Sequence, residues 1–174
     1  MRNLEIKARN IELAAVRMAL KMLGATKKEL LIQSDSYFRV PKGRFKLRDE
    51  GKNGAYAIFY ERGEKTAQRF STYHTLPVDN PAEFRAFMGS TLGMLVEVHK
   101  RRELWLYKNA RIHLDDVEGL GTFLEIEVVV DRSDVQAKQL MDQLVVCFEL
   151  HKKNYIKSSY SDLLLTAQPK RKRA

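Results

Sequence analysis

The chain is poor in cysteine and in long apolar runs, and each shortage excludes a class of protein. Cys147 is the one cysteine among 174 residues, which excludes an internal disulfide framework and favours a small buried side chain over a nucleophile. No uninterrupted apolar run approaches the roughly 20 residues that a membrane-spanning helix needs, and the N-terminus leads directly into an alternating charged segment instead of a signal peptide. We also find no solenoid repeat and no low-complexity segment. The sequence therefore predicts a soluble, intracellular protein.

Acidic residues are fewer than basic ones. The sequence has 31 Lys and Arg against 22 Asp and Glu, a formal net charge of +9 and a pI of about 9.7. This balance suits an anionic partner, which could be nucleic acid, an acidic membrane surface or a phosphorylated small molecule, and charge alone does not choose among them. The length predicts one domain, over residues 1–168. The basic tail, residues 169–174, is either a disordered solubilising end or a nuclear localisation signal or anion-binding arm.

Acidic side chains alternate with apolar ones in the segment 111–130. Residues 111–115 and 123–130 read as two strands joined by the connection Gly119-Leu120-Gly121. The polar faces of these strands carry Arg111, His113 and Asp115 on the first, and Glu125 and Glu127 on the second. Carboxylates two residues apart on a strand lie about 6 to 7 Å apart, so they repel each other and favour a cation between them. The alternative is an ordinary amphipathic strand with its polar face in water.

Two further segments show the same alternation. In residues 4–9 the charged side chains Glu5, Lys7 and Arg9 lie opposite an apolar face. In residues 44–48 the charged face is wholly basic and consists of Arg44, Lys46 and Arg48. Three like charges on one strand face destabilise one another unless they are solvated or face an anion. From the residues alone, both explanations remain open.

The remaining elements are predicted from period, caps and turns. Helices are expected at 11–23, capped by Asn10 and with an apolar stripe that includes Met18 and Met22, and at 82–92, 134–150 and 159–165. Further strands are expected at 30–40, 55–62 and 67–75, and residues 94–107 form a long strand or a strand pair. In this last segment we expect Trp105 and Tyr107 to be packing residues.

Several motifs, taken in order, resemble one family. The N-terminal ExExK signature of that family corresponds to Asn3-Leu4-Glu5-Ile6-Lys7, and its late acidic strand, GLG-type turn and ExE strand correspond to Asp115–Glu127. Segments 33–38, 43–48, 58–62 and 98–102 continue the match, so that it covers nearly the whole chain. The chain thus resembles the CYTH family, the triphosphate tunnel metalloenzymes, and within it the branch of the class IV adenylyl cyclases. One departure is Asn3, a neutral amide in place of the first Glu of ExExK.

The resemblance implies an α+β fold: an antiparallel, eight-stranded β-barrel or tunnel with a charged interior and helices packed outside. It also implies hard oxygen ligands for Mg²⁺ or Mn²⁺. The implied metal ligands are Glu5, Asp115, Glu125 and Glu127, with Asp116 on the opposite strand face from Asp115. The implied catalytic residues are Glu5, Lys7, Glu125 and Glu127. The implied phosphate-binding residues are Lys7, Arg9, Arg44, Lys46, Arg48, Arg62, Lys100, Arg102, Arg111 and His113, the last of which is equally well explained as a structural histidine.

Three functions fit this interpretation. We favour a metal-dependent triphosphatase that acts on tripolyphosphate, thiamine triphosphate or a nucleoside triphosphate. The runner-up is an adenylyl cyclase that forms cyclic AMP and pyrophosphate from ATP. The third is a binding module for phosphate chains or nucleic acid that has lost catalysis. No Ser–His–Asp or Cys–His arrangement is evident, so catalysis would depend on positioning and electrostatics. The expected partner is a triphosphate-containing small molecule, with nucleic acid less favoured, no membrane, and a homodimer left open. The expected location is cytoplasmic, or nuclear through the tail.

Overall fold

The described part of the chain folds into eight strands and four α-helices. The computed structural model describes residues 2–62, 69–131 and 133–167, and for residues 62 and 69–72 it describes the backbone alone. The expected tail, 169–174, lies outside the described residues, as does the start of the strand expected at 67–75. The strands are β1 (Arg2–Arg9), β2 (Thr26–Phe38), β3 (Arg44–Asp49), β4 (Ala55–Arg62), β5 (Arg69–Pro77), β6 (Met94–Tyr107), β7 (Ala110–Val117) and β8 (Gly121–Val129).

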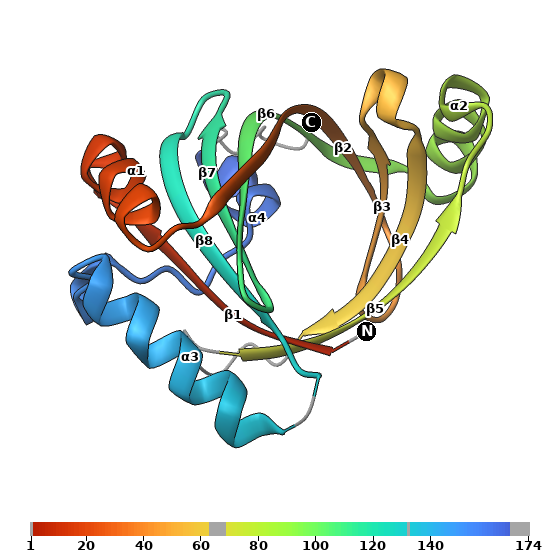
Figure 1. The fold of residues 1–174 in the computed structure, drawn as a ribbon. Helices are drawn as coiled ribbons and strands as arrows, with labels where there is room; N and C mark the ends of the chain where they lie inside the picture. The colour runs from red at the N-terminus through yellow and green to blue at the C-terminus, as the bar shows by residue number, and fades with distance from the viewer. Residues whose placement is uncertain (1, 63–68, 132, 168–174) are drawn as a thin grey trace.

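The strands close into an antiparallel barrel (Figure 1). Their order is β1-β5-β4-β3-β2-β6-β7-β8, and β8 pairs with β1 to complete the circle. The register places Glu5 opposite Glu127 and Lys7 opposite Glu125 across this closing pair. Because side chains alternate along each strand, one face of every strand points into the barrel and the other points out. The predicted α+β barrel is therefore confirmed, and residues 94–107 form one long strand.

The helices are α1 (Leu13–Met22), α2 (Pro81–Leu92), α3 (Asp134–Cys147) and α4 (Tyr160–Ala167). Three of the four helices, α1, α2 and α3, pack outside the barrel over the apolar face of the strands, whereas the start of α4 reaches the barrel interior. In Figure 1, α1 and α3 flank the side formed by β1, β7 and β8, whereas α2 lies at the far side of the barrel, near β3 and β4. Asn80 caps α2 and Ser133 caps α3, each through its side-chain oxygen. No helix within the described ranges is both long and apolar enough to cross a membrane.

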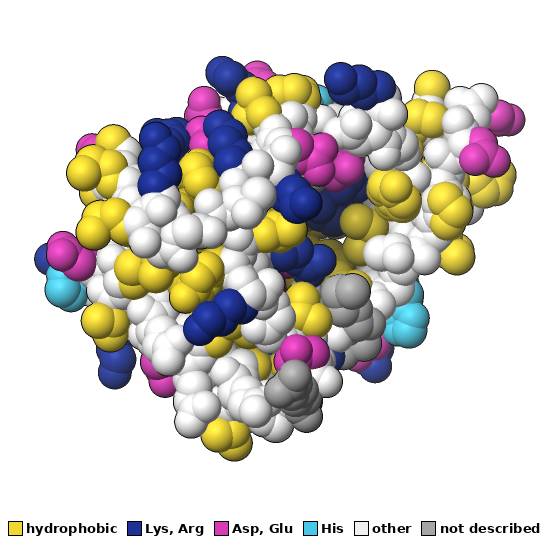
Figure 2. Space-filling model, in the orientation of Figure 1, with side chains coloured by type: hydrophobic (Ala, Val, Ile, Leu, Met, Phe, Trp, Pro, Cys, Tyr) yellow, Lys and Arg dark blue, Asp and Glu magenta, His cyan; other side chains and the backbone are white. Residues whose placement is uncertain are grey.

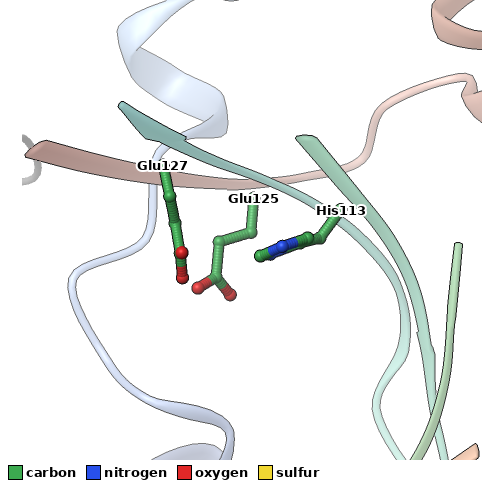
Figure 3. Close-up of side chains that lie close together, drawn as sticks. All are labelled: His113, Glu125 and Glu127. Atoms are coloured by element: carbon green, nitrogen blue, oxygen red, sulfur yellow. The ribbon is translucent and has the colours of Figure 1, made fainter. Parts of the chain in front are cut away.

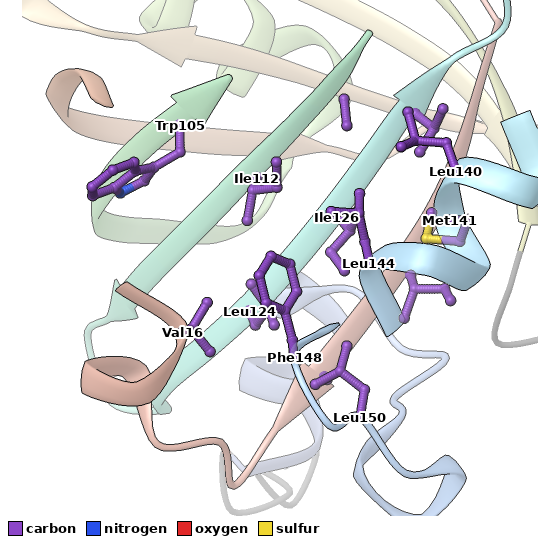
Figure 4. Packing of buried hydrophobic residues seen from close by; sticks show 14 of the residues in the cluster. Val16, Trp105, Ile112, Leu124, Ile126, Leu140, Met141, Leu144, Phe148 and Leu150 are labelled. Atoms are coloured by element: carbon purple, nitrogen blue, oxygen red, sulfur yellow. The ribbon is translucent and has the colours of Figure 1, made fainter. Parts of the chain in front are cut away.

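The main hydrophobic core lies between the outer face of the barrel and the helices α1 and α3 (Figure 4). Ile112 and Ile126, on β7 and β8, are fully buried against Met141 and Leu144 of α3. Trp105 belongs to the same cluster and Tyr107 packs against it, as predicted for packing residues. Cys147 is a free thiol that packs against this core, and it is half-buried, which is less than the sequence predicted. This arrangement leaves the charged faces of the strands to line the interior of the barrel.

The first helix differs from its prediction. It begins at Leu13, is capped by Glu12, and buries Val16 and Leu20. Met18 and Met22, which the predicted stripe had turned inward, are 65% and 86% exposed. The reason is that the segment carries a second apolar stripe at helical spacing, formed by Leu13, Val16, Leu20 and Leu23, and this stripe packs on the core.

The connection between β7 and β8 is tight and needs glycine. Gly119 and Gly121 have φ angles of 74° and 84°, in the region that other residues rarely adopt. The turn lets two acidic strands lie side by side, with His113 opposite Glu125 and Arg111 opposite Glu127. The glycine-marked connection therefore places these four polar side chains on one interior wall.

Candidate functional site

A cavity of about 470 Å³ occupies the interior of the barrel. It is lined mainly by polar and charged side chains that come from all eight strands and from the start of α4. Figure 2 shows one mouth of the barrel, where Lys and Arg side chains lie inside the hollow. A largely charged interior requires that buried charges be paired or bind an ion.

Three side chains on β7 and β8 form a possible metal-binding cluster (Figure 3). One ligand atom from each of His113, Glu125 and Glu127 lies within 4.8 Å of the others. The Nδ1 atom of His113 is buried and has no hydrogen-bond partner among the described residues. Burial, and then the neighbouring Arg102, hold the pKa of His113 well below its usual value, so the ring is neutral at pH 7. A neutral imidazole beside two carboxylates is a chemically suitable donor set for a divalent cation.

The two glutamates of this cluster differ in charge state. Burial opposes ionisation of Glu125, but Lys7 and Arg102 outweigh it, and the pKa lies well below the usual value. Lys7 Nζ lies 3.0 Å from Glu125. For Glu127, burial and then the repulsion by Glu125 raise the pKa to about 7, although Arg111 donates to its carboxylate at 2.8 Å. A bound cation would relieve this repulsion, so the residues fit a metal.

The other two predicted metal ligands have protein partners. Glu5 is almost fully buried beside Glu127 and accepts a hydrogen bond from the Tyr73 hydroxyl at 2.9 Å. Asp115 is completely buried and accepts two hydrogen bonds from Arg102, at 2.6 and 2.7 Å, and one from the Tyr160 hydroxyl at 2.7 Å. Burial opposes ionisation of Asp115, but Arg102 keeps its pKa below the usual value. Asp115 would have to leave Arg102 to bind a metal, and Asp116 is exposed on the other face, as predicted.

The carboxylate of Asp35, on β2, binds three cationic side chains of the basic wall, which consists of Lys46, Arg48, Lys100 and Arg102. Its carboxylate accepts hydrogen bonds from Lys46 at 2.8 Å, from Lys100 at 2.7 Å, and from Arg48 at 2.7 and 2.9 Å. Burial opposes ionisation of Asp35, but the three cations hold its pKa well below the usual value. Burial lowers the pKa of Lys100 to about 8 and that of Lys46 well below its usual value. One carboxylate therefore faces three cationic side chains and cannot neutralise all of their charge. Such an excess of positive charge suits a larger anion.

Most of the predicted phosphate-binding residues line the cavity, but two do not. Those that do are Lys7, Lys46, Arg48, Lys100, Arg102, Arg111 and His113. Arg9 is exposed at the end of β1. Arg44 donates to Asp162 of α4 at 2.7 and 2.9 Å and to Ser159 at 3.1 Å, so it holds the C-terminal helix. Arg62 ends β4, and its side chain lies outside the described residues. Asn3 lines the cavity, and in its better amide orientation it accepts from Arg111 at 2.8 Å.

Several lining residues had no role assigned from the sequence. These are Gln33, Asp35, Tyr37, Glu50, Tyr60, Tyr73, Ser159 and Tyr160, together with some apolar neighbours. Alternation along β2 could have found Gln33, Asp35 and Tyr37, since they share one face of the strand. No sequence signal places Tyr160, whose ring lies under Lys7 Nζ at 3.9 Å, because this contact joins the two ends of the chain.

Comparisons with known proteins agree with this geometry. A curated protein of Methanocaldococcus jannaschii, whose name assigns it provisionally to the adenylate cyclases, is 27% identical to this chain over 94% of this chain and 98% of that protein. The solved structure of protein PH1012 from Pyrococcus horikoshii has a TM-score of 0.82 at 23% identity, over 92% and 98% of the two chains. A Hippeastrum protein, provisionally named an adenylyl cyclase and described as having a dominant triphosphatase activity, has a TM-score of 0.68 at 16% identity, over 95% of each chain.

The family model gives the same result over most of the sequence. Residues 1–159 match the model of the CYTH domain. The match includes all eight strands and every charged residue that lines the cavity. The chain therefore belongs to the CYTH domain family.

Proposed function

We propose that this protein is a divalent-metal-dependent hydrolase of triphosphate compounds, which bind inside the barrel. The observation that carries the proposal is the pairing, in one cavity, of the cluster His113, Glu125 and Glu127 with a wall of buried cations. Carboxylates facing a purely anionic ligand would repel it, so both features are explained together only when a cation accompanies the anion. The substrates considered are tripolyphosphate, thiamine triphosphate and nucleoside triphosphates.

The metal would be held by His113, Glu125 and Glu127, with Glu5 beside them. When bound, Mg²⁺ or Mn²⁺ supplies positive charge at the phosphate oxygens, which stabilises the charge that develops as the phosphoanhydride bond breaks. Of the two ions, Mn²⁺ is the better match to a site with a nitrogen donor.

The basic wall binds and orients the phosphate chain. Arg48 and Arg102 present planar guanidinium groups that suit paired phosphate oxygens, and Lys46 and Lys100 act as compact charges. In the absence of substrate the guanidinium of Arg48 and both amines are held by Asp35, so they converge on one point before any ligand arrives. A phosphate chain adds negative charge beside two lysines whose pKa values are lowered by burial, and thus favours their protonated forms.

Positioning and electrostatic stabilisation supply the catalysis in this proposal. Cys147 belongs to α3, outside the barrel, so it does not reach the substrate. Hydroxyl groups in the cavity include those of Tyr160, which donates to Asp115, and Ser159, which donates to Asp162. The chain's own contribution is to hold the phosphate chain in line and to surround it with fixed charges in a site of low dielectric constant.

A second candidate is adenylyl cyclase activity, favoured by the name of the relative from Methanocaldococcus jannaschii. In that reaction the ribose 3′-hydroxyl of ATP attacks the α-phosphorus, and cyclic AMP and pyrophosphate form. The same cations would bind the leaving pyrophosphate. We favour hydrolysis because it needs only water as the nucleophile, and because a Hippeastrum protein of the same fold is described as having a dominant triphosphatase activity.

The test incubates the purified protein with Mg²⁺ or Mn²⁺ and, separately, with tripolyphosphate, thiamine triphosphate and ATP. Orthophosphate, pyrophosphate and cyclic AMP are followed together. The double variant Glu125→Gln, Glu127→Gln should abolish the reaction, whereas Glu118→Gln, an exposed glutamate, is the matched control. Orthophosphate release that the double variant loses supports the hydrolase, and pyrophosphate with cyclic AMP supports the cyclase. Binding of phosphate chains without turnover would leave the non-catalytic binding module.

A further inference from the structure

Gln33 presents an unsatisfied hydrogen-bond acceptor to the cavity. Its side chain points inward from β2, lines the cavity and is 2% exposed. The amide Nε2 donates to the carboxylate of Glu50, which also lines the cavity, so the amide orientation is fixed by an acceptor. The Oε1 atom is buried and has no partner among the described residues. A buried acceptor without a partner is unfavourable, so this position favours a ligand that donates a hydrogen bond.

The surroundings of Gln33 define what such a ligand must be. Lys100 lies directly opposite Gln33 on β6, and Asp35 is the next inward-facing residue along β2, so the cations of the phosphate wall are adjacent. In the other direction the next inward-facing residue is Leu31, which is 7% exposed, and Leu104 of β6 lines the cavity near it. The two acceptors, Gln33 Oε1 and the Glu50 carboxylate, thus lie between the buried cations and the apolar side chains. A planar group with apolar faces and an N–H donor, attached to a phosphate chain, matches the cations, the acceptors and the apolar side chains.

We propose that Gln33 and Glu50 form a specificity subsite for the amino group of a heterocyclic base carried by the triphosphate, as in adenine. The Gln33 Oε1 atom and the Glu50 carboxylate accept from the exocyclic amine, while Leu31 and Leu104 contact the ring. A base with an oxo group at the same position places an acceptor against two acceptors and is disfavoured. This inference rests on the proposed function, since it names the organic group of the substrate that the cavity binds.

The test compares ATP with inosine triphosphate, whose base carries an oxo group in place of the amino group and a proton on the adjacent ring nitrogen, and includes tripolyphosphate, which has no base. We expect wild-type protein to favour ATP by about tenfold or more in kcat/KM, a factor that corresponds to about 1.4 kcal/mol. Gln33→Met keeps a similar shape, removes one of the two acceptors and should lower the ratio several-fold. Gln139→Met, at an exposed position on α3, is the matched control and should keep the wild-type ratio.

Further measurements distinguish failure of the subsite from failure of the proposed activity. Equal use of ATP and inosine triphosphate by the wild type, or a ratio in Gln33→Met that equals the wild-type ratio, would overturn the subsite, while tripolyphosphate hydrolysis would still support the triphosphatase. Discrimination seen in calorimetric binding without turnover of any substrate would support the subsite and remove the proposed activity. If Gln33→Met fails to fold, Glu50→Gln at the rim tests the same ratio. Thiamine triphosphate, which also carries an amine, is measured in parallel, and a loss confined to it would assign the subsite to an aminopyrimidine instead of adenine.

Discussion

Replacing Asp35 by asparagine is the sharpest test of how the cavity is held together. The carboxylate accepts four hydrogen bonds from Lys46, Arg48 and Lys100, all between 2.7 and 2.9 Å, and is 2% exposed. Removing one partner from a buried ion pair costs about 3–5 kcal/mol, because the remaining charges are left uncompensated. We expect Asp35→Asn to lower the free energy of unfolding by about 3 kcal/mol at pH 7. We take the lower end of this range of energies because Lys100, with a pKa of about 8, is able to lose its proton.

The loss of folding stability in Asp35→Asn should depend on pH. The direction of this dependence follows from the pKa values of Lys46 and Lys100. Without Asp35 the pKa values of Lys46 and Lys100 in the folded protein fall further, so the unfolded chain binds more protons than the folded one. The stability of the variant therefore rises with pH, and its deficit relative to wild type is larger at pH 6 than at pH 9. Added tripolyphosphate should stabilise the variant more than the wild type, since it replaces the missing negative charge and binds the folded state.

The assay is urea unfolding followed by the fluorescence of Trp105, the one tryptophan of the sequence, which is buried in the main core. Asp116→Asn is the matched control, because Asp116 is exposed on a strand of the same barrel. A loss below about 1 kcal/mol for Asp35→Asn, similar to that of the control, would refute the view that this carboxylate compensates three buried cations. Equal stabilisation of Asp35→Asn and of the wild type by tripolyphosphate would refute this view as well.

Two other predictions concern the metal cluster and an outer ion pair. Asn3→Glu restores the missing carboxylate of the N-terminal motif, and we expect calorimetry to show Mn²⁺ binding about tenfold tighter. Unchanged affinity would mean that Arg111, the present partner of Asn3, neutralises the new charge. Glu103 accepts from Arg17, and this hydrogen bond is the main cause that holds its pKa at about 2. Because the folded pKa lies below the unfolded value of 4.5, the stability that Glu103 contributes is present above pH 4.5 and is lost as the pH falls toward 2. Thermal unfolding of Glu103→Gln should therefore change less over that range than that of wild type or Glu118→Gln, and parallel curves for all three would contradict the assignment.

The alternation of charged and apolar residues determined which side of each strand faces the cavity. Glu5 and Lys7 on β1, and Glu125 and Glu127 on β8, were assigned to the polar face from the sequence, and they lie inside the barrel. This works because the side-chain period of a strand is two, so a few residues fix the face of the whole strand. Periodicity failed for α1, because the segment carries two apolar stripes at helical spacing, and the one with Val16 and Leu20 is buried instead of the one with Met18 and Met22.

The tertiary structure alone decided which charges meet. Periodicity gives the face of a side chain but neither its depth in the barrel nor its partner across strands that are distant in the sequence. Arg44 shares a strand face with Lys46, yet it bonds to Asp162 of α4 instead of lining the cavity. Asp35 meets Lys100 because β2 pairs with β6, a strand that begins more than 50 residues later in the sequence. The sequence by itself thus determined the fold class and the inward faces, whereas ring closure and strand register determined the ion pairs, the His113 cluster and the unpaired oxygen of Gln33.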